Sequence, residues 1–278
     1  MEPKCTALIF MISTLVWISE SNETADFNVT NEILAIKQEQ AILKSKQAEF
    51  ELKNKQDYVR NINKNSHVYA DCAEVRDNSM PSGIYEIQIP KSGSSKVYCD
   101  TKTWGGPWTV ILRRMDGSVN FYRTWRRYRE GFGDLDGEFF LGLYKIYALT
   151  SESSQELLVQ LEDSQGNQTY ESYGKFAIAS DDEYFALNTL GEASGTAGDS
   201  LSHHHTQPFT TYDLNNGNGT NCAEKYTGGW WYGNPCHESN LCGKYGDNTF
   251  GKGVNWKTFR GFENSLKRVV MMIRPRKL

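Results

Sequence analysis

The sequence predicts an α+β globular domain preceded by a helical stalk. Residues 22–64 contain no Gly, Pro or Cys and are rich in helix-forming residues. Several later segments between residues 83 and 190 alternate apolar and polar residues, as half-buried strands do. After Leu201 regular patterns fade until residue 265, which indicates long loops. The 278 residues, 38% of them hydrophobic and 13% aromatic, suit one sizeable domain with a short appendage.

Residues 1–21 are predicted to be a secretory signal peptide. Lys4 supplies the positive start, and Thr6 to Ile18 is an apolar run. This run is shorter than the roughly 20 apolar residues that span a bilayer, and no later stretch is long enough either. The alternative is a short signal anchor. We expect a secreted, extracellular protein without a membrane partner.

Residues 22–64 are predicted to form a helical, oligomerising stalk. Apolar residues recur every seven positions, at Val29, Ile36, Leu43 and Phe50. These residues occupy position d of a seven-residue repeat. The other core position of the repeat, position a, is occupied by Ile33, Gln40, Gln47 and Asn54, most of which are polar. We expect a parallel homo-oligomeric coiled coil. A lone solvated helix or a disordered stalk is the alternative, because so short a seam is marginal by itself.

Residues 65–70 are predicted to be a linker, and residues 71–278 the globular domain. A hairpin is expected over 83–100, around the turn at 90–95, followed by a strand at 108–114. A short amphipathic helix is expected at 138–148. Further strands are expected at 156–163, 169–179, 185–190 and 265–274. The net charge of −4, with no basic cluster, argues against a nucleic-acid partner.

Five ordered blocks of this domain resemble the fibrinogen-related domain. They are Trp104-Gly-Gly-Pro-Trp-Thr-Val, Arg113 to Tyr122, Gly131 to Leu143, Ser194 to Leu201, and Gly253-Val-Asn-Trp256-Lys, and the aromatic, cysteine-flanked stretch Asn221 to Tyr245 resembles the C-terminal part of the same domain. The resemblance covers about Asp71 to the C-terminus and extends to ficolins, tachylectins, angiopoietins and fibrinogen. It implies a twisted antiparallel sheet with short helices and long C-terminal loops.

The resemblance also implies the disulfides. It pairs Cys72 with Cys99 and Cys222 with Cys236, and leaves Cys242 over. Cys242 is either a buried free thiol or the site of an intermolecular bridge. Sequons at Asn28, Asn167 and Asn218 are expected to carry glycans and agree with secretion; a fourth, at Asn22, lies close to the cleavage region.

A calcium site is expected in the oxygen-rich loop from Asp213 to Asn221. The family holds calcium with an Asp-x-Asp pair and two backbone carbonyls, and calcium prefers such oxygen ligands. This chain has Asp213 but Asn215 at the second position, and the lost carboxylate should weaken binding. The alternative is a metal-free turn.

A ligand pocket is implied beside that loop. Ficolin-like lectins hold the acetyl group of N-acetylated sugars in a small aromatic pocket, which maps here onto Tyr226, Cys236, His237, Phe250, Gly251 and Phe262. An acetamide needs one or two polar partners and a hole for one methyl group. Pro235 and altered loop lengths depart from the family pattern. The alternative is that these rings merely pack the loop.

Two other motifs indicate little chemistry. Three successive residues, His203 to His205, cannot easily face one metal ion, and a solvated loop is the better interpretation. Gly198-Asp-Ser-Leu201 matches the nucleophile block of an esterase class, but the required C-terminal Asp-x-x-His is missing. We therefore expect no enzymatic activity.

The resemblance implies a secreted lectin that recognises acetylated carbohydrates, in innate immune recognition of microbial surfaces. The stalk would make its weak single sites multivalent. The alternative function is a non-lectin receptor ligand or a matrix or adhesion protein. Asn215 and the altered loops favour this alternative, whereas the Cys236-His237 pair and the aromatic residues favour the lectin.

Overall fold

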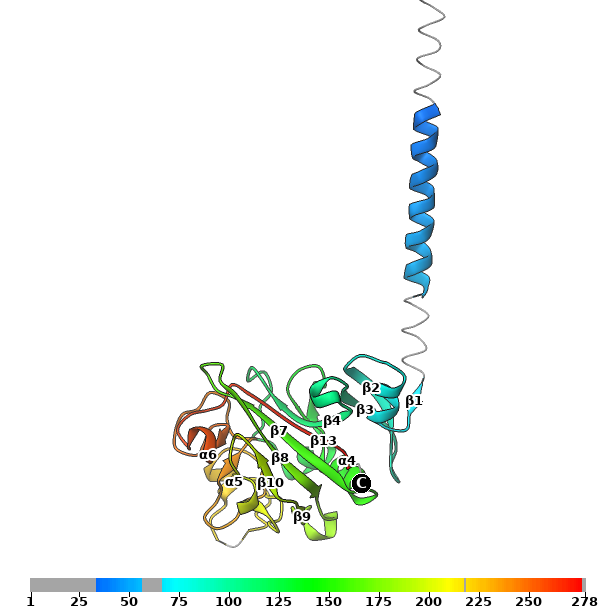
Figure 1. Cartoon of the computed structure of the whole chain (residues 1–278). Coiled ribbons are helices and arrows are strands. Elements are labelled where there is room, and N and C mark those ends of the chain that lie inside the picture. Colours follow the sequence, from blue (N-terminus) through cyan, green and yellow to red (C-terminus); the bar gives the residue numbers. More distant parts are fainter. Residues whose placement is uncertain (1–33, 57–66, 218, 277–278) are drawn as a thin grey trace, which may run out of the picture. The chain divides into compact units, whose positions relative to one another are not determined.

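The structure is a computed structural model that describes residues 34–56, 67–217 and 219–276 (Figure 1). The chain divides into two compact units, residues 1–66 and the head at 67–278. The signal peptide predicted at 1–21 lies outside the described residues, as do the sequons at Asn28 and Asn218.

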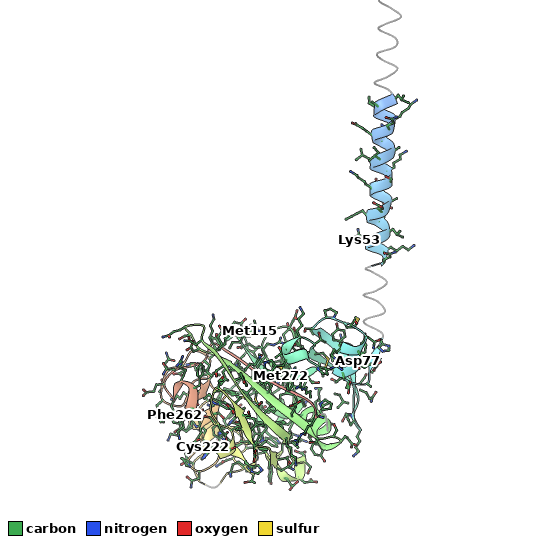
Figure 2. The ribbon with its side chains drawn as sticks, in the orientation of Figure 1. Lys53, Asp77, Met115, Cys222, Phe262 and Met272 are labelled. Carbon is green, nitrogen blue, oxygen red and sulfur yellow. A yellow bond between two sulfur atoms is a disulfide. The ribbon has the colours of Figure 1, made fainter. Side chains whose placement is uncertain are left out.

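A single α-helix occupies residues 34–56, which confirms that part of the predicted stalk as helical. Its side chains project from it on all sides in Figure 2. The seam residues Ile36, Leu43 and Phe50 are 54%, 65% and 64% exposed. Leu34, Ile42 and Leu52, which the predicted seam omits, are equally exposed apolar residues. No helix in the described parts of the chain has the length and apolarity needed to cross a membrane.

The described residues of the head build one large twisted sheet. Its main path runs β1 (Val68–Tyr69), β2 (Gly83–Ile89), β3 (Gly93–Asp100), β4 (Trp108–Arg114), β13 (Arg268–Pro275), β7 (Gln155–Glu162), β8 (Gln168–Ala177) and β10 (Ala193–Gly195). The short strands β5 (Phe132–Gly133), β6 (Phe139–Phe140) and β9 (Thr189–Leu190) extend it. Its neighbouring strands are antiparallel except β1 and β2, which pair in parallel.

The last strand of the chain lies in the middle of the sheet. β13 pairs with β4 on one side and β7 on the other, and Val269 to Ile273 are all buried. Both faces of β13 are covered along Val269 to Ile273, so both faces carry apolar side chains. The strand is therefore marked by a continuous apolar run rather than by alternation. Because β13 pairs with β4, the loops before β13 lie against the end of β4, where Arg114 donates to the carbonyls of Leu241 and Gly243.

Helices in the head are short. They are α2 (Cys72–Asp77), α3 (Trp125–Glu130), α4 (Leu143–Ser151), α5 (Cys222–Lys225) and α6 (Lys257–Arg260), with 3-10 turns η1 (Thr103–Gly105), η2 (Asp181–Glu183) and η3 (Ser202–His204). Between Leu201 and β13 the chain is mostly loop, with one small ladder of β11 (Ser239–Asn240) and β12 (Asn255–Trp256). The side chains that fill the head are drawn in Figure 2.

The predicted hairpin and the strands at 108–114, 156–163 and 169–179 are confirmed within two residues. The helix predicted at 138–148 starts too early, because Phe139 and Phe140 pair with β4 and the helix begins only at Leu143. Glu138 is fully buried and its carboxylate accepts hydrogen bonds from the backbone N–H groups of Met115, Asp116 and Val119. This carboxylate fixes the segment in an extended form.

Of the strand predicted at 185–190, only Thr189 and Leu190 pair with β8. The predicted linker at 65–70 is also partly wrong, since β1 within it joins the sheet. Strand β1 leads into α2, which Asp71 caps by accepting hydrogen bonds from the N–H groups of Ala73 and Glu74. The head therefore begins before the predicted boundary at Asp71.

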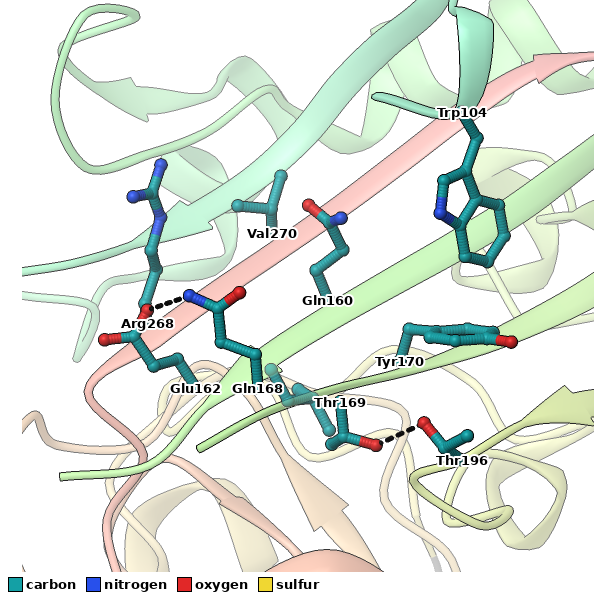
Figure 3. Close-up of a pocket in the computed structure, with 10 residues that line it drawn as sticks. Trp104, Gln160, Glu162, Gln168, Thr169, Tyr170, Thr196, Arg268 and Val270 are labelled. Carbon is teal, nitrogen blue, oxygen red and sulfur yellow. Dashed lines mark hydrogen bonds between the residues drawn. The ribbon is translucent and has the colours of Figure 1, made fainter. Parts of the chain in front are cut away.

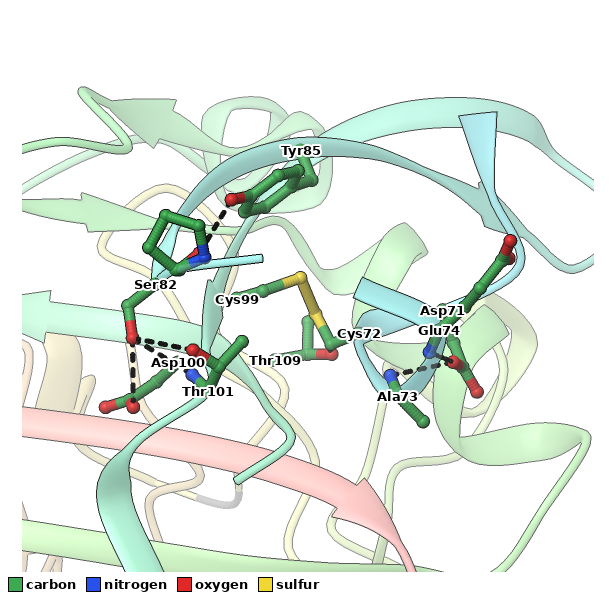
Figure 4. Close-up of a disulfide and its surroundings, with 11 residues drawn as sticks. Asp71, Cys72, Ala73, Glu74, Ser82, Tyr85, Cys99, Asp100, Thr101 and Thr109 are labelled. Carbon is green, nitrogen blue, oxygen red and sulfur yellow. Dashed lines mark hydrogen bonds between the residues drawn. A yellow bond between two sulfur atoms is a disulfide. The ribbon is translucent and has the colours of Figure 1, made fainter. Parts of the chain in front are cut away.

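Figure 4 shows the first disulfide, between Cys72 at the start of α2 and Cys99 on β3. The two sulfur atoms are 2.02 Å apart, and both residues are buried. The bridge closes a 27-residue separation, which should stabilise the head by about 3 kcal/mol in the chain-entropy account. It fastens the first helix of the head to the sheet.

Candidate functional site

The structure brings together the residues predicted to line a ligand pocket. We call Tyr226, His237, Phe250, Gly251 and Phe262 the His237 cluster. The His237 ring lies edge-on to Tyr226 at 4.5 Å and to Phe262 at 5.5 Å between ring centroids. Phe250 and Phe262 lie 4.9 Å apart, and Phe250 is 55% exposed. The cluster thus runs from a buried imidazole to an exposed phenyl ring.

His237 is buried without a hydrogen-bond partner. It is 6% exposed, and neither ring nitrogen has a partner of normal geometry among the described residues. Burial lowers the pKa of His237 to about 4, against an opposing effect of the Gly251 carbonyl. The imidazole is therefore neutral at physiological pH, with one N–H donor and one acceptor nitrogen. A buried polar group without a partner costs free energy that a ligand could recover.

Gly251 allows the close packing of the cluster. Its φ of +75° is in the left-handed region, which favours glycine. A Cβ atom there would lie 2.6 Å from the Tyr226 ring and 3.0 Å from the His237 ring. The two rings therefore fill the space beside the Gly251 backbone, whose N–H group donates to the Phe262 carbonyl.

The second disulfide holds the loop that carries His237. Cys222 and Cys236 are bonded with their sulfur atoms 1.92 Å apart. Asn221 caps α5, directly before Cys222, by accepting from the N–H groups of Ala223 and Glu224. The peptide between Asn234 and Pro235 is cis. Both pairings implied by the resemblance are thus present in the structure.

Two buried asparagines position the other side of the cluster, and sequence reasoning missed both. Asn240 on β11 donates from Nδ2 to the Tyr226 carbonyl at 2.9 Å. Asn255 on β12 donates from Nδ2 to the Gly251 carbonyl at 3.1 Å. Both side chains are fully buried, so these bonds replace the strand pairing that the loops lack. Asparagine in an otherwise irregular segment gave no signal of this role.

His204 supports the His237 loop by bonding to its backbone, and sequence reasoning missed this role as well. Its Nε2 accepts hydrogen bonds from the backbone N–H groups of Glu238 and Ser239, at 3.3 and 3.1 Å. Nδ1 must then carry the proton and donate to the Trp231 carbonyl at 2.6 Å. Burial lowers the pKa of His204 to about 3, so the ring stays neutral.

The solvated-loop interpretation of His203 to His205 is therefore wrong for His204, which is fully buried. His203 and His205 contact other carbonyls, those of Pro235 and Asn188. Across the part of the chain that the structure describes, no group of three or more His, Cys, Asp or Glu side chains is placed to hold a metal ion.

The side chains of Asp213 and Asn215 in the predicted calcium loop both make hydrogen bonds. Asp213 Oδ1 accepts hydrogen bonds from the Trp125 N–H group and the Thr211 hydroxyl, both at 2.8 Å. Asn215 Oδ1 accepts from the Gly217 N–H group, and its Nδ2 donates to the Gly219 carbonyl. Calcium needs six to eight oxygen ligands, usually with several carboxylates. The loop offers one carboxylate, Asp213, and Oδ1 of that carboxylate already accepts from Trp125 and Thr211, which lie outside the loop.

Ser200 of the esterase-like block is fully buried, and its hydroxyl lies 2.9 Å from that of Thr258. No histidine among the described residues hydrogen-bonds it. Cys242 is fully buried too, and burial raises the pKa of its thiol to about 12. The structure thus favours the buried free thiol over the intermolecular bridge.

The chain belongs to the fibrinogen-related family: residues 68–276 match the C-terminal globular domain of fibrinogen beta and gamma chains. Human tenascin-R is 43% identical over 209 residues, 74% of this chain and 15% of tenascin-R. Human angiopoietin-related protein 6 is 43% identical over 217 residues, 76% of this chain and 46% of the relative.

Among solved structures, lamprey fibrin D-dimer in complex with the peptide Gly-His-Arg-Pro-amide is similar with a TM-score of 0.73 and 28% identity. The similarity covers 99% of this chain and 95% of the lamprey chain. The chain spans less than half the length of the two curated relatives. Their names are those of a tenascin and of an angiopoietin-related protein.

Proposed function

We propose that the head is a non-enzymatic extracellular recognition module that binds a protein partner through the His237 cluster. The observation that carries the proposal is the exposed ring of Phe250, which packs on Phe262 beside the buried, neutral imidazole of His237. A partner that covers Phe250 would gain apolar burial, and the rings of His237 and Phe262 hold Phe250 in place for it. This is the receptor-ligand or adhesion alternative of the sequence analysis.

Two findings support a protein partner over an acetylated sugar. The relatives reported above are an angiopoietin-related protein and a tenascin, and the lamprey structure holds a peptide. In addition, the rings of Tyr226 and His237 fill the space beside Gly251, one of the residues expected to line the acetyl pocket.

The test is binding of the tagged, secreted chain to a panel of mammalian cell lines. We expect binding that trypsin treatment of the cells abolishes and that free N-acetylglucosamine does not compete. Phe250→Ala should weaken binding about tenfold, as for an anchor residue. Tyr184→Ala, which truncates another aromatic residue that is 48% exposed, serves as the matched control. Binding that survives trypsin, or that Phe250→Ala leaves unchanged, would contradict the proposal.

An acetyl-binding lectin is the second candidate. The same imidazole could bond an acetamide, and Phe250 and Phe262 could enclose its methyl group. Retention on N-acetylated resin that His237→Ala abolishes, with unchanged thermal unfolding, would support this candidate. A wild-type chain that is not retained would reject it.

We also propose that Asp213 and Asn215 bind calcium weakly. The loop lacks one carboxylate, so restoring it with Asn215→Asp should tighten calcium binding. Isothermal calorimetry of both proteins tests this. Heat from neither protein would reject a calcium site.

We further propose that the chain is secreted and forms a homo-oligomer through the stalk. Two disulfides and the exposed sequon at Asn167 suit an oxidising, glycosylating compartment. The exposed seam at Ile36, Leu43 and Phe50 would be buried between copies. Light scattering should show an oligomer that a Leu43→Gln/Phe50→Gln variant dissociates. A monomeric wild type would reject the stalk's role.

A further inference from the structure

A cavity on the face of the sheet, lined by none of the residues of the His237 cluster, has the make-up of a saccharide site. It has a volume of about 420 Å³ and lies over β13, β7 and β8, next to the η1 turn (Figure 3). We define the Trp104 groove by Trp104, Gln160, Glu162, Tyr170 and Arg268, which line it.

The strand register arranges the groove in two rows. Arg268, Glu162 and Gln168 lie opposite one another across the three strands and form the charged row. Val270, Gln160 and Tyr170 form the second row in the same way. Figure 3 shows Trp104 reaching in beside Tyr170 at the end of this second row. The face is therefore graded from a charged end to an aromatic corner.

Trp104 and Tyr170 form that corner. Their rings are perpendicular, with centroids 4.5 Å apart, and Trp104 is 51% exposed. Such a large exposed indole is unusual in a head whose other described tryptophans are at least partly buried. Sugar rings carry C–H groups on their faces and hydroxyls around their rims. An open aromatic corner suits the faces, and nearby amides suit the hydroxyls.

The turn that carries Trp104 is held in place before any ligand binds. Trp104 adopts a left-handed φ of +47°, a conformation that is costly for a non-glycine residue. Asp100 accepts hydrogen bonds from the N–H groups of Lys102 and Thr103. The Arg274 guanidinium stacks on Trp108, pairs with Glu156, and donates to the Gly106 carbonyl at 2.7 Å. This support keeps the indole presented, which reduces the ordering cost of binding.

Some polar groups of the groove already have partners within the protein, and others have none among the described residues. Glu162 is already neutralised by Lys267 at 3.4 Å and accepts a hydrogen bond from Gln168. By contrast, the Gln160 amide and the Arg268 guanidinium make no hydrogen bond or ion pair with any described residue. The unused charge in the groove is therefore positive. A guanidinium binds a carboxylate or sulfate through two parallel hydrogen bonds.

A peptide strand is a poorer occupant. The groove lies on the face of the sheet, where the backbone groups of β13 and β7 are already paired on both sides. A peptide that binds by adding a strand needs a free sheet edge. The exposed ring, the free amide and the free guanidinium instead complement a ligand that has C–H faces, hydroxyls and an acid group.

We propose that the Trp104 groove binds an acidic oligosaccharide, with one sugar ring against Trp104 and Tyr170 and an acid group on Arg268. This site is separate from the His237 cluster and does not depend on the function proposed for that cluster.

The test is calorimetric titration of the full mature chain with a galacturonic acid hexamer, in buffer with a calcium chelator. This probe carries carboxylates but no acetyl groups, so an acetyl pocket would not bind it. We expect Trp104→Ala and Arg268→Gln each to weaken binding about tenfold, the loss of one anchor contact. Neutral maltohexaose should bind more weakly than the acidic hexamer, and added salt should narrow the difference.

Matched controls separate the groove from general effects. Tyr184→Ala removes an exposed ring elsewhere, and Arg126→Gln removes an exposed guanidinium on α3; both should bind the hexamer as wild type does. Gln160→Leu keeps the shape of the strand but removes the free amide, and should weaken binding severalfold without changing thermal unfolding. A wild type that does not bind the hexamer, or binding that Trp104→Ala and Arg268→Gln leave intact, would overturn the proposal.

Discussion

The two halves of the head are stabilised in different ways. In the sheet, β4, β13, β7 and β8 satisfy their backbone groups by pairing with one another, and apolar side chains fill the faces. In the loops between Leu201 and β13, single buried side chains take that role. Arg114 of β4 donates to the Leu241 carbonyl, His204 accepts from the Ser239 N–H group, and Asn240 donates to the Tyr226 carbonyl. Order in the loops thus depends on a few polar residues, so we expect them to tolerate substitution poorly.

The largest effect is expected from Arg114→Met. Arg114 is 1% exposed and donates from one guanidinium nitrogen to the carbonyls of Leu241 and Gly243, at 3.0 and 2.8 Å. It also lies 3.5 Å from the buried carboxylate of Glu138. Removing it leaves the buried Glu138 carboxylate with its three backbone N–H bonds but without its cationic partner, and it frees the loop, which should lower the free energy of unfolding by about 3–5 kcal/mol. Denaturant unfolding measures this.

A double variant sharpens that result. If the missing cationic partner of Glu138 causes much of the loss, Arg114→Met/Glu138→Gln should be more stable than the sum of the two single changes. Arg126→Met, on an exposed arginine of α3, is the control and should change stability by less than about 0.5 kcal/mol. Additive single changes would show that the pair does not act as a unit.

His204→Ala is expected to cost about 2–3 kcal/mol. The change leaves the N–H groups of Glu238 and Ser239 and the Trp231 carbonyl without their partner in the interior. Gln155→Ala removes a buried polar side chain from β7, where the strand pairing stays, and should cost only about 1 kcal/mol. If His204→Ala and Gln155→Ala lowered the free energy of unfolding equally, the loops would not depend on single polar side chains more than the sheet does.

A smaller effect is expected from mild acid, which should destabilise the loops that contain His204 and His237. Burial holds the pKa values of His204 and His237 at about 3 and about 4, whereas an unfolded histidine has a pKa of about 6.5. The unfolded chain therefore binds protons first, and stability falls as the pH drops below about 6.5. Between pH 7.4 and 6.0 the two rings should together cost about 1.5 kcal/mol.

The check is thermal or denaturant unfolding across this pH range in wild type and His204→Ala. The variant should show about half of the wild-type loss, because it retains only one of the two buried rings. A wild-type stability that is flat from pH 7.4 to 6.0 would contradict the neutral, buried state of these histidines.

The smallest effect is expected from Cys242→Ser. The thiol is fully buried, so a second chain cannot reach it in the folded head. We expect the same mobility on a non-reducing gel and a stability loss of about 1 kcal/mol, from burying a hydroxyl in place of a thiol. Loss of a covalent dimer band in the variant would show that Cys242 is accessible after all.

Part of this protein could be predicted from its sequence. The strand at 156–163 follows from the alternation of Leu157, Val159 and Leu161, because a strand with one buried face repeats every two residues. The stalk helix at 34–56 follows from composition. The ordered motifs indicated the family, and with it both disulfides and the neighbours Tyr226, His237 and Phe262. These features are local, or are shared motifs of a known fold.

Only the tertiary structure decided the rest. Extended pairing with β4 overrode the helical pattern at Phe139 and Phe140, since the Glu138 carboxylate anchors that segment. The roles of His204, Asn240 and Asn255 leave no periodic trace, because each bonds one particular carbonyl or N–H group in an irregular loop. The Trp104 groove joins residues from η1, β7, β8 and β13, which only the closing of the sheet brings together. Contacts between segments so distant in the sequence depend on how the chain packs, and no local pattern records them.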